Sequence, residues 1–172
     1  MQRKILIKGS LILTFTGIAT RLIGFFYRIF LSRSFGETAV GLYQLIFPVY
    51  ALAISLTSAG IQTAISRSVA REHTLHRDGK CTCILYTGIG LSFLLSMVTM
   101  YLLQHYNSAI AIHFLHEPRC IFSITAMSYA IPFASIHSCI CGYYLGLKQT
   151  RIPAFSQLIE QTTRVAFVGL LF

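Results

Sequence analysis

Charged side chains are scarce in this sequence: Asp, Glu, Lys and Arg make up 11% of its 172 residues, and only five of them are acidic. Apolar residues reach 55%, and the mean hydropathy is +0.67. This balance excludes an ordinary soluble domain, in which about a quarter of the residues are charged. We therefore expect an all-α fold, a polytopic transmembrane helix bundle.

Other features of multidomain or soluble chains are also missing. Tryptophan is absent, so 13 phenylalanines and 9 tyrosines supply the aromatic bulk. No linker rich in Gly, Ser or Pro and no low-complexity tract interrupts the chain, so residues 1–172 are expected to form a single transmembrane bundle. The chain stops inside the apolar run VAFVGLLF, which is typical of a truncated molecule or of the leading part of a longer one.

Motifs for hydrolytic chemistry are missing as well. None of the patterns GxxxxGK[ST], GxGxxG, HExxH and GxSxG is present, so an enzyme is not expected. The cysteines form two C-x-C pairs, Cys81/Cys83 and Cys139/Cys141, but residues two apart on a helix point about 200° away from each other. We expect no metal site and no cofactor. His137 is expected to be hydrogen-bonded within its helix.

Five apolar runs are long enough to cross a bilayer, which takes about 20 helical residues. They lie at residues 9–31, 39–63, 82–103, 121–144 and 154–172. The net charge of +9 would suggest nucleic acid in a soluble chain, but here most charges lie between the apolar runs, and no nucleic-acid partner is expected.

The basic residues are unevenly distributed between the two ends of these spans. Nine of the 14 fall on one side: Arg3, Lys4, Lys8, Arg67, Arg71, Arg77, Lys80, Lys148 and Arg151. Cytoplasmic loops carry the excess of Lys and Arg in membrane proteins. We therefore expect a multi-pass protein of the cell membrane, in contact with membrane lipids, whose N-terminus is cytoplasmic.

The first span, residues 10–32, combines an apolar surface with one polar stripe. Spaced by three and four residues, its members share a helix face: Ser10, Thr14, Gly17, Arg21, Gly24 and Arg28. An arginine near the middle of a span costs roughly 2.5–3.5 kcal/mol on insertion scales, so Arg21 is expected to face a protein interior or an aqueous cavity. Arg28 lies about one turn from the outer end and is expected to snorkel to the headgroups, with substrate contact as the alternative.

The second and fourth spans carry similar stripes of small and polar residues. One contains Gly41, Gln44, Pro48, Ala51, Ser55, Ser58 and Gln62, and the other Thr125, Ser128, Pro132, Ser135, Cys139, Gly142 and Gly146. Such stripes are packing seams or cavity walls, and Gln44 is a candidate substrate contact. Pro48 and Pro132 each remove a backbone hydrogen bond, so we expect helix kinks there, either static or bending during transport.

The fifth span has the most unusual composition, with Gln157, Glu160, Gln161 and Arg164 in an otherwise apolar run. Glu160 and Arg164 are four residues apart and can form an ion pair, which lowers the cost of burying either charge. Glu160 is therefore a candidate for charge balance or ion coupling.

The two central arginines are expected at similar depths in the membrane. At 1.5 Å per residue, Arg164 lies about 16 Å beyond Pro153 and Arg21 about 20 Å beyond Lys8, near the midplane of a core about 30 Å thick. Guanidinium groups bind phosphate oxygens in a bidentate manner. We therefore regard Arg21 and Arg164 as candidate substrate-binding residues, with a structural charge network between the helices as the alternative.

Three stretches of this sequence resemble the stage V sporulation protein B family of polysaccharide-exporter-like membrane proteins. They are KGSLILTFTGIATRLIGFFYRIFLSRSFG (8–36), GLYQLIFPVYALAISLTSAGIQTAISRSVARE (41–72) and PAFSQLIEQTTRVAFV (153–168). That family belongs with the peptidoglycan-precursor flippases and the MATE antiporters in one superfamily. The resemblance implies that this chain covers most of the N-terminal six-helix bundle of a larger transporter with a V-shaped cavity.

The resemblance extends to short motifs of the flippases. Their first helix ends in R-x-x-G-F, which residues 21–25 match, and an R-x-F-G motif follows, which residues 33–36 match. A further cavity arginine of those flippases falls on Tyr27, one position before Arg28.

The resemblance implies a flippase-type transporter of a lipid-linked oligosaccharide or of a cell-wall or spore-cortex precursor, with a polyprenyl-pyrophosphate-linked saccharide as substrate. One alternative is a MATE-like antiporter of cationic drugs, which an arginine-dominated cavity disfavours. The other is a truncated chain that transports nothing.

Overall fold

The structure, a computed structural model, describes residues 2–75 and 77–170. In chain order its helical elements are α1 (Gln2–Phe35), α2 (Glu37–Ile54), the π-helical turn η1 (Ser55–Ala59), α3 (Gly60–Thr74), α4 (Asp78–His105), α5 (Asn107–Ala109), the π-helical turn η2 (Ile110–Phe114), α6 (Cys120–Ser128), α7 (Ala130–Gly146) and α8 (Arg151–Leu170). The described residues contain no strand, which confirms the all-α class.

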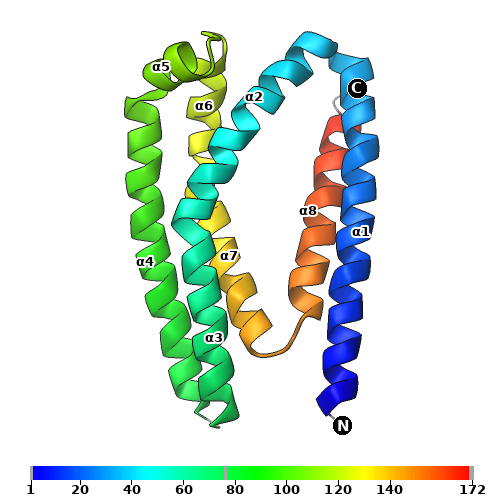
Figure 1. The fold of residues 1–172 in the computed structure, drawn as a ribbon, viewed down its shortest axis with the longest axis vertical. Helices are drawn as coiled ribbons and strands as arrows, with labels where there is room; N and C mark the ends of the chain where they lie inside the picture. The colour runs from blue at the N-terminus through cyan, green and yellow to red at the C-terminus, as the bar shows by residue number, and fades with distance from the viewer. Residues whose placement is uncertain (1, 76, 171–172) are drawn as a thin grey trace.

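The helices run up and down along the long axis of the molecule (Figure 1). The N-terminus, the α3–α4 turn and the α7–α8 connection lie at one end, and the α1–α2 turn, α5 and the end of α8 lie at the other. Gly36 makes the α1–α2 turn with φ +81°, a backbone conformation that residues with a Cβ rarely adopt. The chain therefore reverses its direction between α1 and α2.

The hydropathy of these helices supports a polytopic membrane protein. Three stretches are long and apolar enough to cross a membrane, namely Leu11–Arg33, Val40–Thr74 and Gly79–His105, and α6 with α7 makes a fourth if the bent pair is one span. The predicted count of five is one higher, because α8 is not among them. The polar residues at 157–164 lower the mean hydropathy of α8. A fifth span at residues 154–172 therefore stays a prediction, and its last two residues, 171–172, lie outside the described residues.

Large apolar side chains cover the outside of the bundle. Phe15, Phe122 and Phe133 are 76%, 82% and 76% exposed, as are many leucines and isoleucines to a lesser degree. A soluble protein rarely exposes apolar patches of this extent, whereas lipid tails solvate them. The surface is therefore that of a membrane protein.

Helices α3, α4 and α7 form a tightly packed block. The stripe predicted on the fourth span is a packing seam, since its members from Ser128 to Gly146 are buried. A Cβ on Gly142 would lie 2.7 Å from the Gln62 carbonyl oxygen, and one on Gly146 would lie 2.8 Å from the Ser66 carbonyl oxygen. The absence of these two Cβ atoms lets α7 and α3 approach closely.

The sequence predicts kinks at Pro48 and Pro132, and the structure has two irregular stretches, one after α2 and one between α6 and α7. α2 runs through Pro48 without a break, and the irregular turn is η1, where Thr57 and Ser58 hydroxyls bond the Ala53 and Ile54 carbonyls. α6 and α7 meet at a 42° bend, three residues before Pro132. Pro132 has no backbone N–H to bond the carbonyl four residues earlier, and its ring clashes with that carbonyl. The bend is therefore expected in the turn before Pro132, where it is found.

Candidate functional site

The candidate site lies between α1 and α8, which pack side by side away from the α3–α4–α7 block (Figure 1). Small side chains allow this approach: Thr16 and Thr20 of α1 are buried, and so is Ala154 of α8. The Thr20 hydroxyl donates to the Thr16 and Gly17 carbonyls at 3.0 Å, so its polar group is satisfied within its own helix. The two helices thus form a pair with a polar face between them.

A groove of about 550 Å³ follows this face. It is lined by Gly17, Thr20, Arg21, Gly24, Phe25, Arg28, Gln157 and Gln161. Four members of the stripe predicted on the first span line it, as do two of the polar residues of α8. Among the described residues that line the groove, two are arginines and none is acidic.

Two ion pairs within the described part of the chain join Arg119 to Glu117 and Arg164 to Glu160. Neither pair involves Arg21 or Arg28, the two arginines of the groove. Both groove arginines are exposed, together with the amide side chain of Gln157. Two guanidinium groups and two amides in one groove are donors suited to an anion with several oxygens, such as a diphosphate.

Arg28 lies in the groove with Arg21, two helical turns further along α1. The sequence alone favours a snorkelling role for Arg28, whereas the structure gives it the same groove as the central arginine. At a rise of about 1.5 Å per residue, their Cα atoms are about 10 Å apart along the helix.

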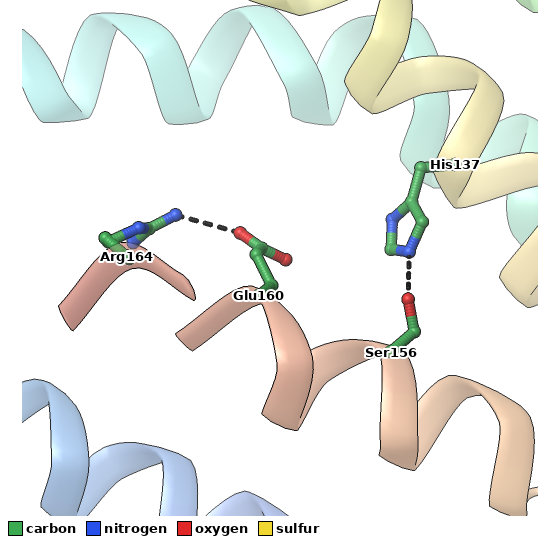
Figure 2. A network of polar contacts seen from close by, with 4 residues as sticks. All are labelled: His137, Ser156, Glu160 and Arg164. Atoms are coloured by element: carbon green, nitrogen blue, oxygen red, sulfur yellow. Dashed lines mark hydrogen bonds and ion pairs between the residues drawn. The ribbon is translucent and has the colours of Figure 1, made fainter. Parts of the chain in front are cut away.

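Glu160 and Arg164 of α8 form an ion pair within their own helix. Arg164 Nη2 donates to Glu160 Oε1 at 2.8 Å, and the side chains are 53% (Glu160) and 41% (Arg164) exposed (Figure 2). Neither lines the groove. The structure therefore separates Arg164 from the groove that contains Arg21, although the sequence predicts one depth for both.

The other residues singled out from the sequence are more dispersed. Gln44 is exposed on α2 and does not line the groove. His137 of α7, in contrast, reaches across to α8, where its Nε2 lies 2.6 Å from the Ser156 hydroxyl (Figure 2). The sequence predicts a hydrogen bond for His137 but not its partner, since the contact joins two helices.

A second groove of about 470 Å³ is almost entirely apolar. It lies between α2, α4 and η2 and is lined by Val49, Leu52, Ala53, Leu56, Thr99, Leu102, Leu103, Tyr106, Ile110 and Phe114. Such a surface suits a hydrocarbon chain, and none of its lining residues carries a charge that could pair with an anionic headgroup.

Comparison with known proteins agrees with the membrane character of the chain. A sequence profile of the family described as "Polysaccharide biosynthesis protein" matches residues 6–172. The chain is 31% identical over 170 residues to stage V sporulation protein B of Bacillus subtilis (strain 168), a match that covers 99% of this chain and 33% of that protein. No solved structure matches the chain significantly.

Two further relatives come from the same organism. The lipid II flippase MurJ is 24% identical over 173 residues, covering 95% of this chain and 31% of that protein. The uncharacterized membrane protein YabM is 24% identical over 169 residues, covering 96% of this chain and 30% of its own length. The chain spans about a third of the length of the curated relatives it matches. Because the family profile matches nearly its whole length, the chain belongs to the polysaccharide biosynthesis protein family of membrane exporters and flippases.

Proposed function

We propose that this chain forms the N-terminal part of a flippase-type transporter, and that the groove between α1 and α8 binds the pyrophosphate of a polyprenyl-linked saccharide. The substrate class is a lipid-linked oligosaccharide or a cell-wall or spore-cortex precursor. The observation that carries this proposal is the groove itself, which presents Arg21 and Arg28 with no acidic side chain among its described lining residues. The relative whose name identifies it as a lipid II flippase supports the substrate class.

Each group in the groove has a distinct role in this proposal. Arg21 and Arg28 supply charge-assisted hydrogen bonds to phosphate oxygens, and Gln157 and Gln161 add neutral donors from the facing helix. The polyprenyl chain stays in the bilayer, beside the exposed phenylalanines of the bundle. No bond is broken in this process, so the chain acts as a transporter and not as an enzyme.

The basic end of the bundle faces the cytoplasm in this proposal. The N-terminus, the α3–α4 turn and the α7–α8 connection lie together at one end, and this end carries the nine basic residues counted from the sequence (Figure 1). Substrate made in the cytoplasm therefore enters the groove from the end where the positive charges gather. The bends at η1 and between α6 and α7 are the places where the bundle yields during alternating access.

A test of ligand class separates this function from a MATE-like antiporter. With the purified chain in lipid nanodiscs, a polyprenyl pyrophosphate is expected to bind at least about tenfold tighter than the polyprenol of equal length, because only the former engages the guanidinium groups. Tetraphenylphosphonium, a lipophilic cation, is expected to bind weakly. Preference for the cation would overturn the proposal in favour of cation transport.

Substitution of the second groove arginine gives an intermediate effect. Arg28→Gln keeps a hydrogen-bond donor but removes the charge, so the affinity for the polyprenyl pyrophosphate is expected to fall about tenfold. Arg33→Gln is the matched control, because Arg33 is an exposed arginine of the same helix that does not line the groove. Equal losses in the two variants would show that general surface charge, not the groove, attracts the ligand.

A further inference from the structure

The two walls of the groove between α1 and α8 differ in chemistry. α1 contributes the guanidinium groups of Arg21 and Arg28, and α8 contributes the amides of Gln157 and Gln161. A guanidinium has only N–H donors and no acceptor, whereas an amide has N–H donors and also a carbonyl oxygen that accepts. An ionised diphosphate offers acceptors only, so the guanidinium groups suit it fully. The amide oxygens of α8 are left for a part of the ligand that carries donors.

The two amides of α8 are available to such a ligand. They lie one helical turn apart on the same stripe, with Gln157 exposed and Gln161 half-buried. Within the part of the chain that the structure describes, no hydrogen bond joins either amide to another residue, whereas the neighbouring Glu160 is paired with Arg164. A ligand that lies along α8 in the groove can therefore contact both amides.

The groove is larger than a diphosphate requires. The two phosphorus and seven oxygen atoms of a diphosphate fill less than about 270 Å³, even if each takes the share of one liquid water, roughly 30 Å³. The groove has a volume of about 550 Å³, so about half of it remains. Gly17 and Gly24 keep this space open, since a Cβ on either would meet nothing within 4 Å. The remaining volume accommodates one further group of similar size.

The chemistry of the lining restricts what this further group can be. The described lining residues include two arginines and no carboxylate, so an ammonium group would be repelled although it carries donors. A sugar ring is neutral, and its hydroxyl groups both donate and accept. Phe25 also lines the groove and is 60% exposed, so its ring can pack against the C–H groups on the apolar face of a sugar. A sugar therefore matches the space, the acceptors and the charge of the groove.

We propose that Gln157 and Gln161 recognise the first sugar of the lipid-linked substrate, so that the groove selects a glycosylated diphosphate over one without a sugar. This inference rests on the proposed function, since it takes Arg21 and Arg28 as the groups that hold the diphosphate. The two helices divide the ligand: α1 binds its charge, and α8 binds the neutral group next to it. Each amide accepts from one hydroxyl through its oxygen and donates to a neighbouring hydroxyl through its nitrogen.

The test is a ratio of two dissociation constants, measured for the chain in lipid nanodiscs. One ligand is a polyprenyl pyrophosphate with a single glucose on its terminal phosphate. The other carries a methyl group in place of the glucose, so both diphosphates have the same charge. The wild-type chain is expected to bind the glucosylated ligand about tenfold tighter, because only this ligand gives the amides of α8 their partners.

Removal of the amides is expected to remove this preference. In the double variant Gln157→Leu, Gln161→Leu the ratio is expected to lie within about twofold of one, since leucine is similar in size but forms no hydrogen bond. Affinity for the methyl ester is expected to fall less than about threefold, because the guanidinium groups still hold it, and this binding shows that the variant is folded. Gln157→Leu alone, at an exposed position, is expected to lower the ratio about threefold. The matched control is Gln44→Leu, which keeps the wild-type ratio because Gln44 is an exposed glutamine of α2 outside the groove.

Failure of this inference and failure of the proposed function give different results. Equal binding of the two ligands by the wild type, or the same ratio in the wild type and the double variant, would overturn recognition of the sugar while the arginine site stands. Displacement of the glucosylated ligand by phosphatidylethanolamine that depends on the two glutamines would also overturn it, in favour of a lipid headgroup. If neither diphosphate binds better than the polyprenol, the proposed function itself is wrong.

Discussion

Arg21→Glu is expected to weaken binding of a polyprenyl pyrophosphate by about a hundredfold, equivalent to about 3 kcal/mol. The variant removes a bidentate donor from the middle of the groove and places a carboxylate against the phosphate oxygens. Arg28 and the two glutamines remain, so residual affinity persists. The measurement is the dissociation constant of the polyprenyl pyrophosphate for the chain in lipid nanodiscs at constant salt.

The control for Arg21→Glu is the same charge reversal outside the groove. Arg67 is exposed on α3 and does not line the groove, so Arg67→Glu is expected to change the affinity less than about twofold. If Arg67→Glu weakens binding as much as Arg21→Glu does, the affinity reflects the net charge of the protein. Unchanged binding in Arg21→Glu itself would remove this residue from the site.

Gly142→Ala is expected to destabilise the bundle by about 2–3 kcal/mol, although alanine is the better helix former. The added methyl group would lie 2.7 Å from the Gln62 carbonyl oxygen and 3.3 Å from the Gln62 Cα, and a helix backbone moves less easily than a side chain. α7 therefore shifts away from α3, and the Ser138–Gln62 hydrogen bond at 2.9 Å lengthens or breaks. The loss is measured as the free energy of unfolding in mixed micelles.

Gly90→Ala is the matched control for this packing effect. Gly90 also lies within a helix, α4, but a Cβ there meets nothing within 4 Å. Its replacement is expected to leave the free energy of unfolding unchanged or to raise it by up to about 1 kcal/mol, through helix propensity alone. Only Gly142→Ala is therefore expected to lower the free energy of unfolding. A loss of stability in Gly90→Ala as large as that in Gly142→Ala would contradict the close approach of α7 to α3.

Much of the fold could be predicted from the sequence because each helix carries its own signal. Runs of apolar residues predict the passes of the chain, and the spacing of Ser128, Pro132 and Ser135 predicts the seam of α7. The irregular turn η1 could not be predicted, because it depends on local hydrogen bonds of Thr57 and Ser58 more than on Pro48. The count of spans differs because α8 is too polar to qualify by composition alone.

The candidate site could be predicted only in part. The stripe of α1 identifies Arg21 and Arg28 as neighbours on one face, since helical spacing is a local property. Which face of α8 meets that stripe is set by tertiary packing, so Gln157 and Gln161 rather than Arg164 complete the groove. No local spacing in the sequence carries that information.

Contacts between helices could also be predicted only in part from the sequence. The pairing of His137 with Ser156 depends on how α7 packs against α8, so the sequence alone does not identify it. The close approach of α7 to α3 has a local signal, because Gly142 and Gly146 form a G-x-x-x-G spacing that places both glycines on one helix face. The sequence therefore predicts which face of α7 packs closely but not the helix against which it packs.

The most direct test of the groove between α1 and α8 is to locate the bound diphosphate by photo-crosslinking. The probe is a polyprenyl pyrophosphate that carries a diazirine in the isoprene unit next to the diphosphate, and labelled peptides of the chain are identified by mass spectrometry. We expect labels in α1 at residues 17–28 and in α8 at residues 157–161, removed by excess unlabelled polyprenyl pyrophosphate but not by the polyprenol. Labels concentrated instead in the apolar groove between α2 and α4, or insensitive to the pyrophosphate competitor, would contradict the account.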